Sequence, residues 1–273
     1  MSVESPFTQS NPDSAGAHRS LAPWVETAVY LSLLAAVEIV SDAPYPVWGI
    51  WLHAGLAAWL LVRAATRFYR PEGRFFAGLA AITIFRIVNF AAAEEPFTGI
   101  WYYLVVEGLL IPLAFYGARA LGLSRRQLGL QIPRCWWFAA LTVLSGFPLG
   151  WFEEQYLHPR PMAASLTFGH LWWPALVLVA ATGLGEELFF RGFLQPLAEA
   201  GLGQWPGILA TSIVWSLLHI VWHSSMDLSF VCLVGIFWGW VRDWTDSVWA
   251  TSLAHGIVNI LVFLVLPLLA VRH

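Results

Sequence analysis

The chain has 273 residues, of which 58% are apolar and only 11% are charged. Soluble domains carry about 25% charged residues, so this composition excludes an ordinary soluble enzyme and predicts an integral membrane protein. The net charge is only -3 at pH 7 and all 14 basic residues are arginines, a balance that gives no sign of a nucleic-acid partner.

Hydropathy predicts an all-α fold, a polytopic transmembrane helical bundle of about eight to nine spans. A span needs about 20 predominantly apolar residues to cross the hydrocarbon core of a bilayer. Residues 1–22 are rich in Ser, Pro and Asn, contain no apolar run, and are predicted to be a disordered lead rather than a signal peptide. The predicted spans are 24–41, 47–66, 75–93, 100–120, 135–152, 172–200, 205–223, 227–242 and 248–270.

An amphipathic linker divides the membrane region into two predicted parts. Residues 121–133 are expected to lie along the inner membrane surface, because they combine apolar and polar side chains: Leu123, Leu128, Leu130 and Ile132 against Arg125, Arg126 and Gln127. The N-terminal part, residues 23–120, has four spans, and the C-terminal part, residues 121–273, holds every candidate catalytic residue.

Arginine placement predicts the orientation of the spans. The second and fourth loops are rich in arginine, whereas the first, third and seventh have none. Because basic residues collect in cytoplasmic loops, these two loops and the N-terminus are predicted to face the cytoplasm. The arginines of the two loops are Arg63, Arg67, Arg70, Arg74, Arg119, Arg125, Arg126 and Arg134.

Buried charge in the N-terminal part has a structural explanation. Arg86 and Glu107 lie equally far from the turn near residues 95–98, so an antiparallel hairpin would bring them level. Ionisable side chains inside a membrane commonly pair with one another, so an ion pair is predicted here.

The sixth span carries the first candidate catalytic residues. Ionisable groups are costly within a bilayer, which makes Glu186 and Glu187 candidates for function. Helical positions four apart share a face, so Glu187 can pair with Arg191. The adjacent Glu186 then projects elsewhere and is available as a general base.

Three further residues are predicted to lie at the depth of Glu186. Glu186 and His219 are about equally far from the turn at residues 201–204, and the last span returns to a similar depth at His255. Asn259 follows one helical turn later on the same face. A carboxylate, two imidazoles and an amide in one pocket suit water attack on an amide bond, with a base for the water and donors for the oxyanion.

These residues form three ordered motifs. They are Glu186-Glu187-Leu-Phe-Phe-Arg191-Gly192, then His219, then His255-Gly-Ile-Val-Asn259. The motifs resemble the signature of the family of CAAX-processing and bacteriocin-processing (CPBP) membrane proteases, which includes the type II CAAX prenyl endopeptidases. The resemblance extends from about residue 121 onward, and the first four spans add nothing to it.

The resemblance implies a glutamic-type intramembrane endopeptidase that uses no metal or other cofactor. Glu186 and His219 would activate water, and His255 and Asn259 would bind the oxyanion. The implied substrate is a membrane-anchored or lipidated protein or peptide within the lipid bilayer. The chain is expected to be a multi-pass protein of the cell membrane, which in a bacterium is the cytoplasmic membrane.

Two supporting residues and one departure complete the comparison with the family. Glu187 and Arg191 would hold the first motif helix in place. The family usually has Phe four residues before the His of the second motif, where this chain has Trp215. This change is expected to alter the shape of the pocket more than its chemistry.

Two alternative functions stay open on the sequence. Glu186, His219 and His255 are suitable zinc ligands, so the chain could be a zinc-dependent membrane protease, although it has no His-Glu-x-x-His motif. It could also be a catalytically idle scaffold or chaperone that holds a membrane segment in the same cavity.

Overall fold

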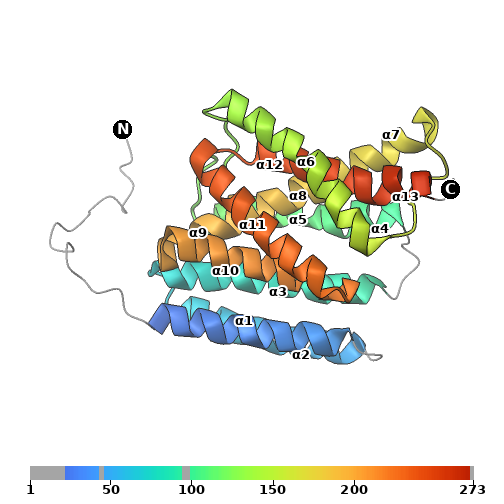
Figure 1. Ribbon diagram of the computed structural model, residues 1–273. Helices are drawn as coiled ribbons and strands as arrows, with labels where there is room; N and C mark the ends of the chain where they lie inside the picture. The colour runs from blue at the N-terminus through green and yellow to red at the C-terminus, as the bar shows by residue number, and fades with distance from the viewer. Residues whose placement is uncertain (1–21, 43–45, 94–98, 271–273) are drawn as a thin grey trace.

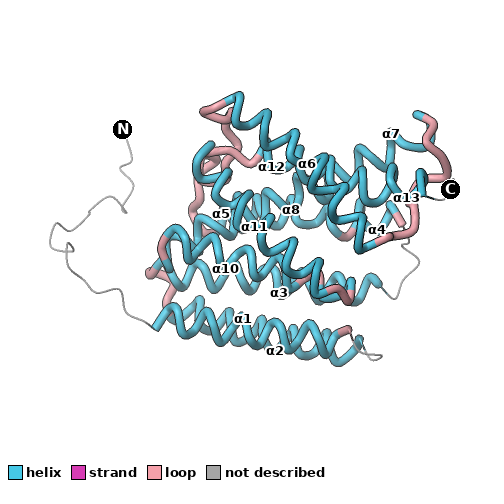
Figure 2. Tube along the Cα trace, viewed as in Figure 1, coloured by secondary structure: helices cyan, strands magenta, loops and turns pink. Residues whose placement is uncertain are grey.

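The computed structural model describes residues 22–42, 46–93 and 99–270. The predicted N-terminal lead lies outside this part, apart from Ala22, at which the first helix begins. The described residues are almost entirely helical, and an isolated bridge joins Leu130 to Ser247 (Figure 2). The all-α prediction is confirmed.

The N-terminal part consists of helices α1 to α5, with a short 3₁₀ turn between the last two. The helices are α1 Ala22–Ser41, α2 Pro46–Thr66, α3 Pro71–Ala93, α4 Ile100–Val105 and α5 Leu110–Ala120, and the turn is Glu107–Leu109.

The C-terminal part begins with α6 and continues into a long helical segment that includes π-helical stretches. Its helices are α6 Trp136–Leu157, α7 Phe168–Val177, α8 Gly185–Glu187, α9 Gln195–Leu202, α10 Gln204–Leu217, α11 Ser225–Thr245, α12 Trp249–Ile260 and α13 Leu266–Ala270. The π-helical stretches are Leu178–Leu184, Leu188–Leu194 and Leu261–Val265.

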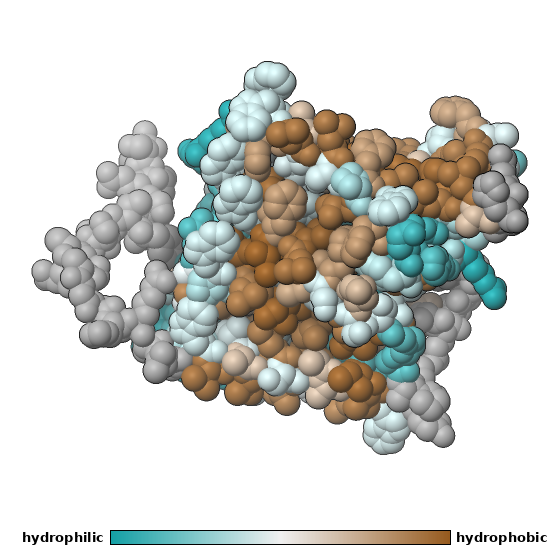
Figure 3. Space-filling model, viewed as in Figure 1, coloured by the Kyte–Doolittle hydropathy of each residue, from teal (hydrophilic) through white to brown (hydrophobic). Residues whose placement is uncertain are grey.

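Seven helical segments of the described chain are long and apolar enough to cross a membrane, so the chain is a multi-pass membrane protein. They include the continuous segment Phe168–Leu202 and exclude α6 and α10. In the visible face of Figure 3, apolar residues fill the middle and hydrophilic residues gather toward the left and right margins. That pattern is expected of a bundle whose helices run between two polar interfaces.

Three predicted boundaries differ from the structure in ways that affect the site. The predicted span 227–242 is part of the longer helix α11, which is capped at its start by Ser224 and continues past the apolar run to the buried Thr245. Helix α10 ends at Leu217, so His219 lies in the turn that follows it. Helix α6 continues to Leu157, five residues past the predicted end.

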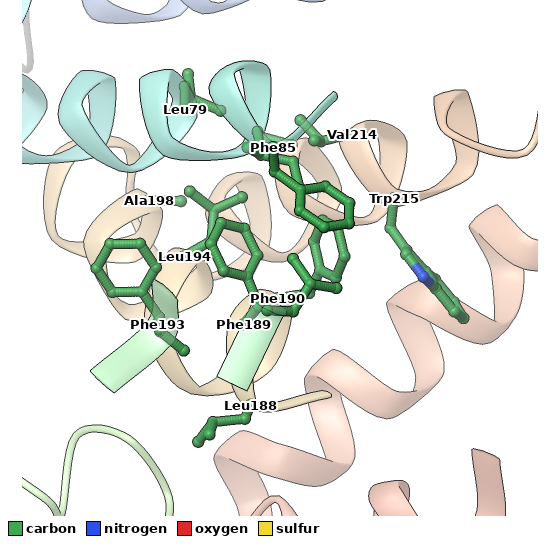
Figure 4. Packing of buried hydrophobic residues seen from close by; sticks show 14 of the residues in the cluster. Leu79, Phe85, Leu188, Phe189, Phe190, Phe193, Leu194, Ala198, Val214 and Trp215 are labelled. Atoms are coloured by element: carbon green, nitrogen blue, oxygen red, sulfur yellow. The ribbon is translucent and has the colours of Figure 1, made fainter. Parts of the chain in front are cut away.

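The helices form layers around the segment that carries the first motif. Helices α1 and α2 lie at the bottom of Figure 1, α3 and α10 above them, and α6, α7 and α12 on the opposite side. Figure 4 shows the apolar packing: Leu79 and Phe85 of α3 lie on the side of the motif segment toward which Phe189 and Leu194 project. The motif helix is therefore enclosed by both parts of the chain.

The linker between the two parts folds into turns against one end of the bundle. Leu128 is buried, and a Cβ placed on Gly192 would lie 2.7 Å from its carbonyl oxygen. The Arg242 guanidinium donates a hydrogen bond to the Gln127 carbonyl oxygen. These contacts connect the linker to both the motif segment and α11.

Small residues allow α12 to lie very close to its neighbours. A Cβ on Gly183 would lie 2.7 Å from the Ser252 carbonyl oxygen, and one on Gly146 would lie 2.5 Å from the Ala254 carbonyl oxygen. Gly146 and Gly150 form a small-xxx-small pair of the kind that packs membrane helices together. Through these contacts α12 lies directly between α6 and the motif segment.

Candidate active site

The two motif glutamates lie in different surroundings although they are adjacent. They belong to the short helix α8, which has a π-helical stretch on either side. Such wide turns occur frequently at functional sites. Glu187 is fully buried, whereas Glu186 is partly exposed to a pocket.

Glu187 is held by two positively charged or proton-donating side chains. Its Oε1 atom lies 3.2 Å from Nη1 of Arg191 and 3.4 Å from Nδ1 of His255. All three side chains are buried, and the Arg191 guanidinium also lies over the Trp215 ring, 4.1 Å from its centroid. Glu187 thus connects the motif segment to α12, because His255 belongs to that helix.

A second polar contact joins the same two elements one turn further along α12. The Asn259 amide nitrogen donates a hydrogen bond to the Thr182 hydroxyl, at 2.7 Å. That hydroxyl in turn donates to the Leu178 carbonyl oxygen. Because the Thr182 hydroxyl already donates its proton, it must accept from Asn259, and this requires the amide nitrogen to face it. The second N–H of that amide stays available to a ligand.

Trp215 connects the catalytic candidates to one another. Its indole N–H donates a hydrogen bond to Oε2 of Glu186 at 2.7 Å. Its carbonyl oxygen accepts a hydrogen bond from Nδ1 of His219 at 3.0 Å, which leaves Nε2 of His219 as an acceptor. The sequence comparison treated Trp215 as a matter of pocket shape, but a Phe in its place could not donate to Glu186.

The structure brings the four candidate side chains to one pocket. Glu186, His219, His255 and Asn259 all line it, and they come from the motif segment, the turn after α10 and helix α12. An adjoining cavity shares His219, His255 and Asn259 with the pocket. Their joint placement is a structural fact, whereas their catalytic role stays a prediction.

Glu153 lines both the pocket and the adjoining cavity, and the sequence reasoning missed it. It lies in α6, on the turn after Gly150, and only 9% of it is exposed. The predicted span ended at residue 152, which left Glu153 in a loop. A signal was present, since Gly146 and Gly150 identify the face of α6 that packs against α12, and Glu153 shares that face.

A buried polar chain leads from the N-terminal helices to the site. Arg86 forms an ion pair with Glu38, with its Nη2 atom 2.5 Å from Oε2, rather than the predicted direct pair with Glu107. Arg86 also donates to Asn89 at 2.7 Å, and Asn89 donates to Glu107 at 3.1 Å. The Glu107 backbone lies against α8, with its carbonyl oxygen 3.6 Å from a Cβ placed on Gly185.

The arrangement of possible metal ligands bears on the zinc alternative. Across residues 22–42, 46–93 and 99–270, no three His, Cys, Asp or Glu side chains are grouped as a metal site requires. In particular, Glu186 and His219 already have protein partners in Trp215.

The fold and the pocket together define a class: a polytopic, all-α membrane protein with a carboxylate, two imidazoles and an amide around one membrane pocket. Residues 168–261 match the model of a family described as type II CAAX prenyl endopeptidase Rce1-like. The resemblance of the motifs to the CAAX protease family is therefore confirmed over this region of the chain.

The matched region runs from α7 to the end of α12 and includes all four candidate residues. It excludes α1 to α6, and hence Glu153 and the buried polar chain of the N-terminal helices. A search of the curated proteins and a search of the solved structures each found no match. The family supports membrane protease activity on membrane-associated substrates.

Proposed function

We propose that the protein is a glutamic-type intramembrane endopeptidase that cleaves a membrane-anchored or lipidated protein or peptide. The observation that carries the proposal is the shared pocket of Glu186, His219, His255 and Asn259. These residues supply both acceptors for water and donors for an oxyanion, which amide hydrolysis requires.

In the proposed reaction, Glu186 takes a proton from a water molecule that also donates a hydrogen bond to Nε2 of His219. The water oxygen attacks the substrate carbonyl carbon, and the carbonyl oxygen becomes an oxyanion. Collapse of this intermediate breaks the C–N bond, and the proton on Glu186 passes to the leaving nitrogen. Trp215 keeps Glu186 in position throughout, because its indole N–H holds the other carboxylate oxygen.

The oxyanion would be bound by donors from α12. Asn259 offers the N–H that Thr182 does not use. His255 is the second donor in this mechanism: it would present Nε2–H to the oxyanion, while its Nδ1 atom lies 3.4 Å from Oε1 of Glu187. Such fixed donors act strongly because they need no reorganisation in a site of low dielectric constant.

The Glu186→Gln variant tests the proposed function. It should fold normally and abolish cleavage, because the amide keeps the volume of the side chain but cannot accept the water proton. Membranes that contain the wild type or the variant would be compared by mass spectrometry of protein termini. Termini produced only by the wild type would identify the substrate and the scissile bond.

Glu154→Gln is the matched control for this experiment. Glu154 is also a buried glutamate, but it bonds to Gln155 and faces His158 rather than the pocket. We expect its termini to match those of the wild type. Equal cleavage by Glu186→Gln and the wild type would refute the catalytic assignment, and identical termini in every sample would favour the idle scaffold.

We further propose that the loops around residues 63–74 and 119–134 face the cytoplasm, as the arginine distribution indicates. After Cys135 and Cys232 are replaced by Ser, Tyr69→Cys should react with an impermeant thiol reagent only in opened cells. Arg160→Cys, in the exposed loop between α6 and α7, should react in intact cells. The opposite labelling pattern would invert the proposed orientation.

A further inference from the structure

Glu153 is a buried carboxylate for which the described part of the chain offers no hydrogen-bond donor. Its side chain lines both the catalytic pocket and the adjoining cavity. It experiences the charges of two further carboxylates, Asp227 and Glu186, and no hydrogen bond or ion pair connects it to another described residue. A charge buried without a partner is costly, so such groups commonly mark a place where a ligand binds.

The adjacent Glu154 shows that only the α6 carboxylate that faces the cavity lacks a hydrogen-bond partner among the described residues. Glu154 is as buried as Glu153. It accepts a hydrogen bond from Gln155 at 3.1 Å, and its Oε1 atom lies 3.6 Å from Nδ1 of His158. At the end of α6, Glu154, which faces away from the site, therefore has polar partners. Glu153, which faces the site, has none among the described residues.

Asp227 is a second buried carboxylate, close enough to Glu153 for the two charges to interact. It is fully buried in the first turn of α11, and neither of its carboxylate oxygens has a hydrogen-bond partner among the described residues. The buried Arg191 forms its ion pair with Glu187 rather than with Glu153 or Asp227. Glu153 and Asp227 are thus left without an ion pair among the described residues, which favours a positively charged ligand.

The remaining walls of the cavity are apolar. Leu149 of α6, Phe230 and Val234 of α11 and Val258 of α12 line it beside the catalytic histidines. The cavity has a volume of about 30 Å³ and the pocket beside it about 100 Å³, and Glu153 lines both, so they suit a side chain whose aliphatic stem lies in the pocket and whose charged end reaches the cavity. Arginine and lysine have this form, because their methylene groups pack on apolar surface while the charged group reaches a polar partner.

We propose that the cavity is a specificity subsite, in which Glu153 binds the basic side chain of an arginine or lysine residue next to the scissile bond. The inference rests on the proposed function, since it assigns the cavity to a residue of the substrate. The buried charge of Asp227 strengthens the attraction, and the apolar walls contact the aliphatic stem. An acidic residue at the same substrate position would be excluded by the two carboxylates.

A binding experiment tests the subsite without depending on cleavage. The probes are dodecanoyl-arginine amide and dodecanoyl-citrulline amide, which have nearly the same shape and differ in charge. Each would be titrated against purified protein in detergent, followed by tryptophan fluorescence. The wild type should bind the arginine probe more tightly by roughly 30-fold or more, the factor expected for a buried charge that gains its partner.

Two variants assign the preference to the proposed residue. Glu153→Gln should bind both probes with similar affinity, since it keeps the volume and loses the charge. Glu154→Gln should keep the preference of the wild type. Equal binding of the two probes by the wild type, or an undiminished preference in Glu153→Gln, would overturn the proposal.

Cleavage assays separate this proposal from the proposed function. A lipidated peptide that is cleaved in a Glu186-dependent manner should be cleaved faster with Arg than with citrulline beside the scissile bond, and Glu153→Gln should remove that difference. If no peptide is cleaved while the binding preference persists, the protease assignment fails and the subsite stands. If cleavage is Glu186-dependent but indifferent to Arg and citrulline, the subsite fails and the protease assignment stands.

Discussion

Arg191→Leu should lower the free energy of unfolding by about 3–5 kcal/mol, the cost of breaking a buried ion pair by removing one partner. Arg191 is 2% exposed and its Nη1 atom lies 3.2 Å from the fully buried Glu187. Leucine would strand that carboxylate and would also remove the guanidinium from the Trp215 ring. Unfolding by denaturing detergent in mixed micelles would measure the loss.

The double variant Glu187→Leu/Arg191→Leu separates the stranded charge from simple loss of packing. Replacing both partners of a buried ion pair with apolar residues is often neutral or stabilising. The double variant should therefore recover most of the stability that Arg191→Leu loses, although it should be inactive, because His255 no longer faces a carboxylate. Equal instability of the single and double variants would show that Arg191 acts through packing alone.

Asn259→Ala should reduce turnover by about 100- to 1000-fold, the usual effect of removing one oxyanion donor. The Michaelis constant should change little, since the donor acts mainly on the charge that develops in the transition state. Thr182→Val should cause a smaller loss, because Asn259 keeps its donor but loses the hydroxyl that fixes its orientation. Steady-state kinetics on a substrate identified from the Glu186-dependent termini would measure both effects.

The same assay after prolonged exposure to a strong chelator tests the zinc alternative. In the proposed mechanism Glu186 and His219 activate the water and α12 binds the oxyanion, so activity should survive the chelator. Loss of activity that stoichiometric zinc restores, together with near-normal turnover in Asn259→Ala, would instead identify Glu186, His219 and His255 as metal ligands. Elemental analysis of the purified protein provides the independent check.

The sequence predicted the fold class and the family because both depend on patterns within single segments. Apolar runs define spans, and the motif residues recur at helical spacing. Depth arguments from the turns also placed Glu186, His219, His255 and Asn259 at one level, and in the structure these residues line one pocket. The distance of each residue from the nearest turn therefore predicted which residues share a pocket.

Contacts between helices could not be predicted, since they depend on how each helix is rotated and on its exact end. Arg86 was expected to pair with Glu107, and in the bundle it pairs instead with Glu38 of α1. The hydrogen bond from Trp215 to Glu186 depends on the direction of one ring. Glu153 was missed because α6 continues beyond its apolar run, where hydropathy gives no further signal.

Because α3 packs on the motif segment, the part of the chain that must fold together is larger than residues 168–261, which match the family. A fragment begun at residue 121 would retain every motif, yet Phe189, Phe193 and Leu194 would lose the apolar surface that α3 provides. It would also lack the 3₁₀ turn that supports Gly185 from outside the matched region. A minimal enzyme built from this chain, or a chimera that transplants its motifs, would therefore have to carry α3, α4 and α5 with them.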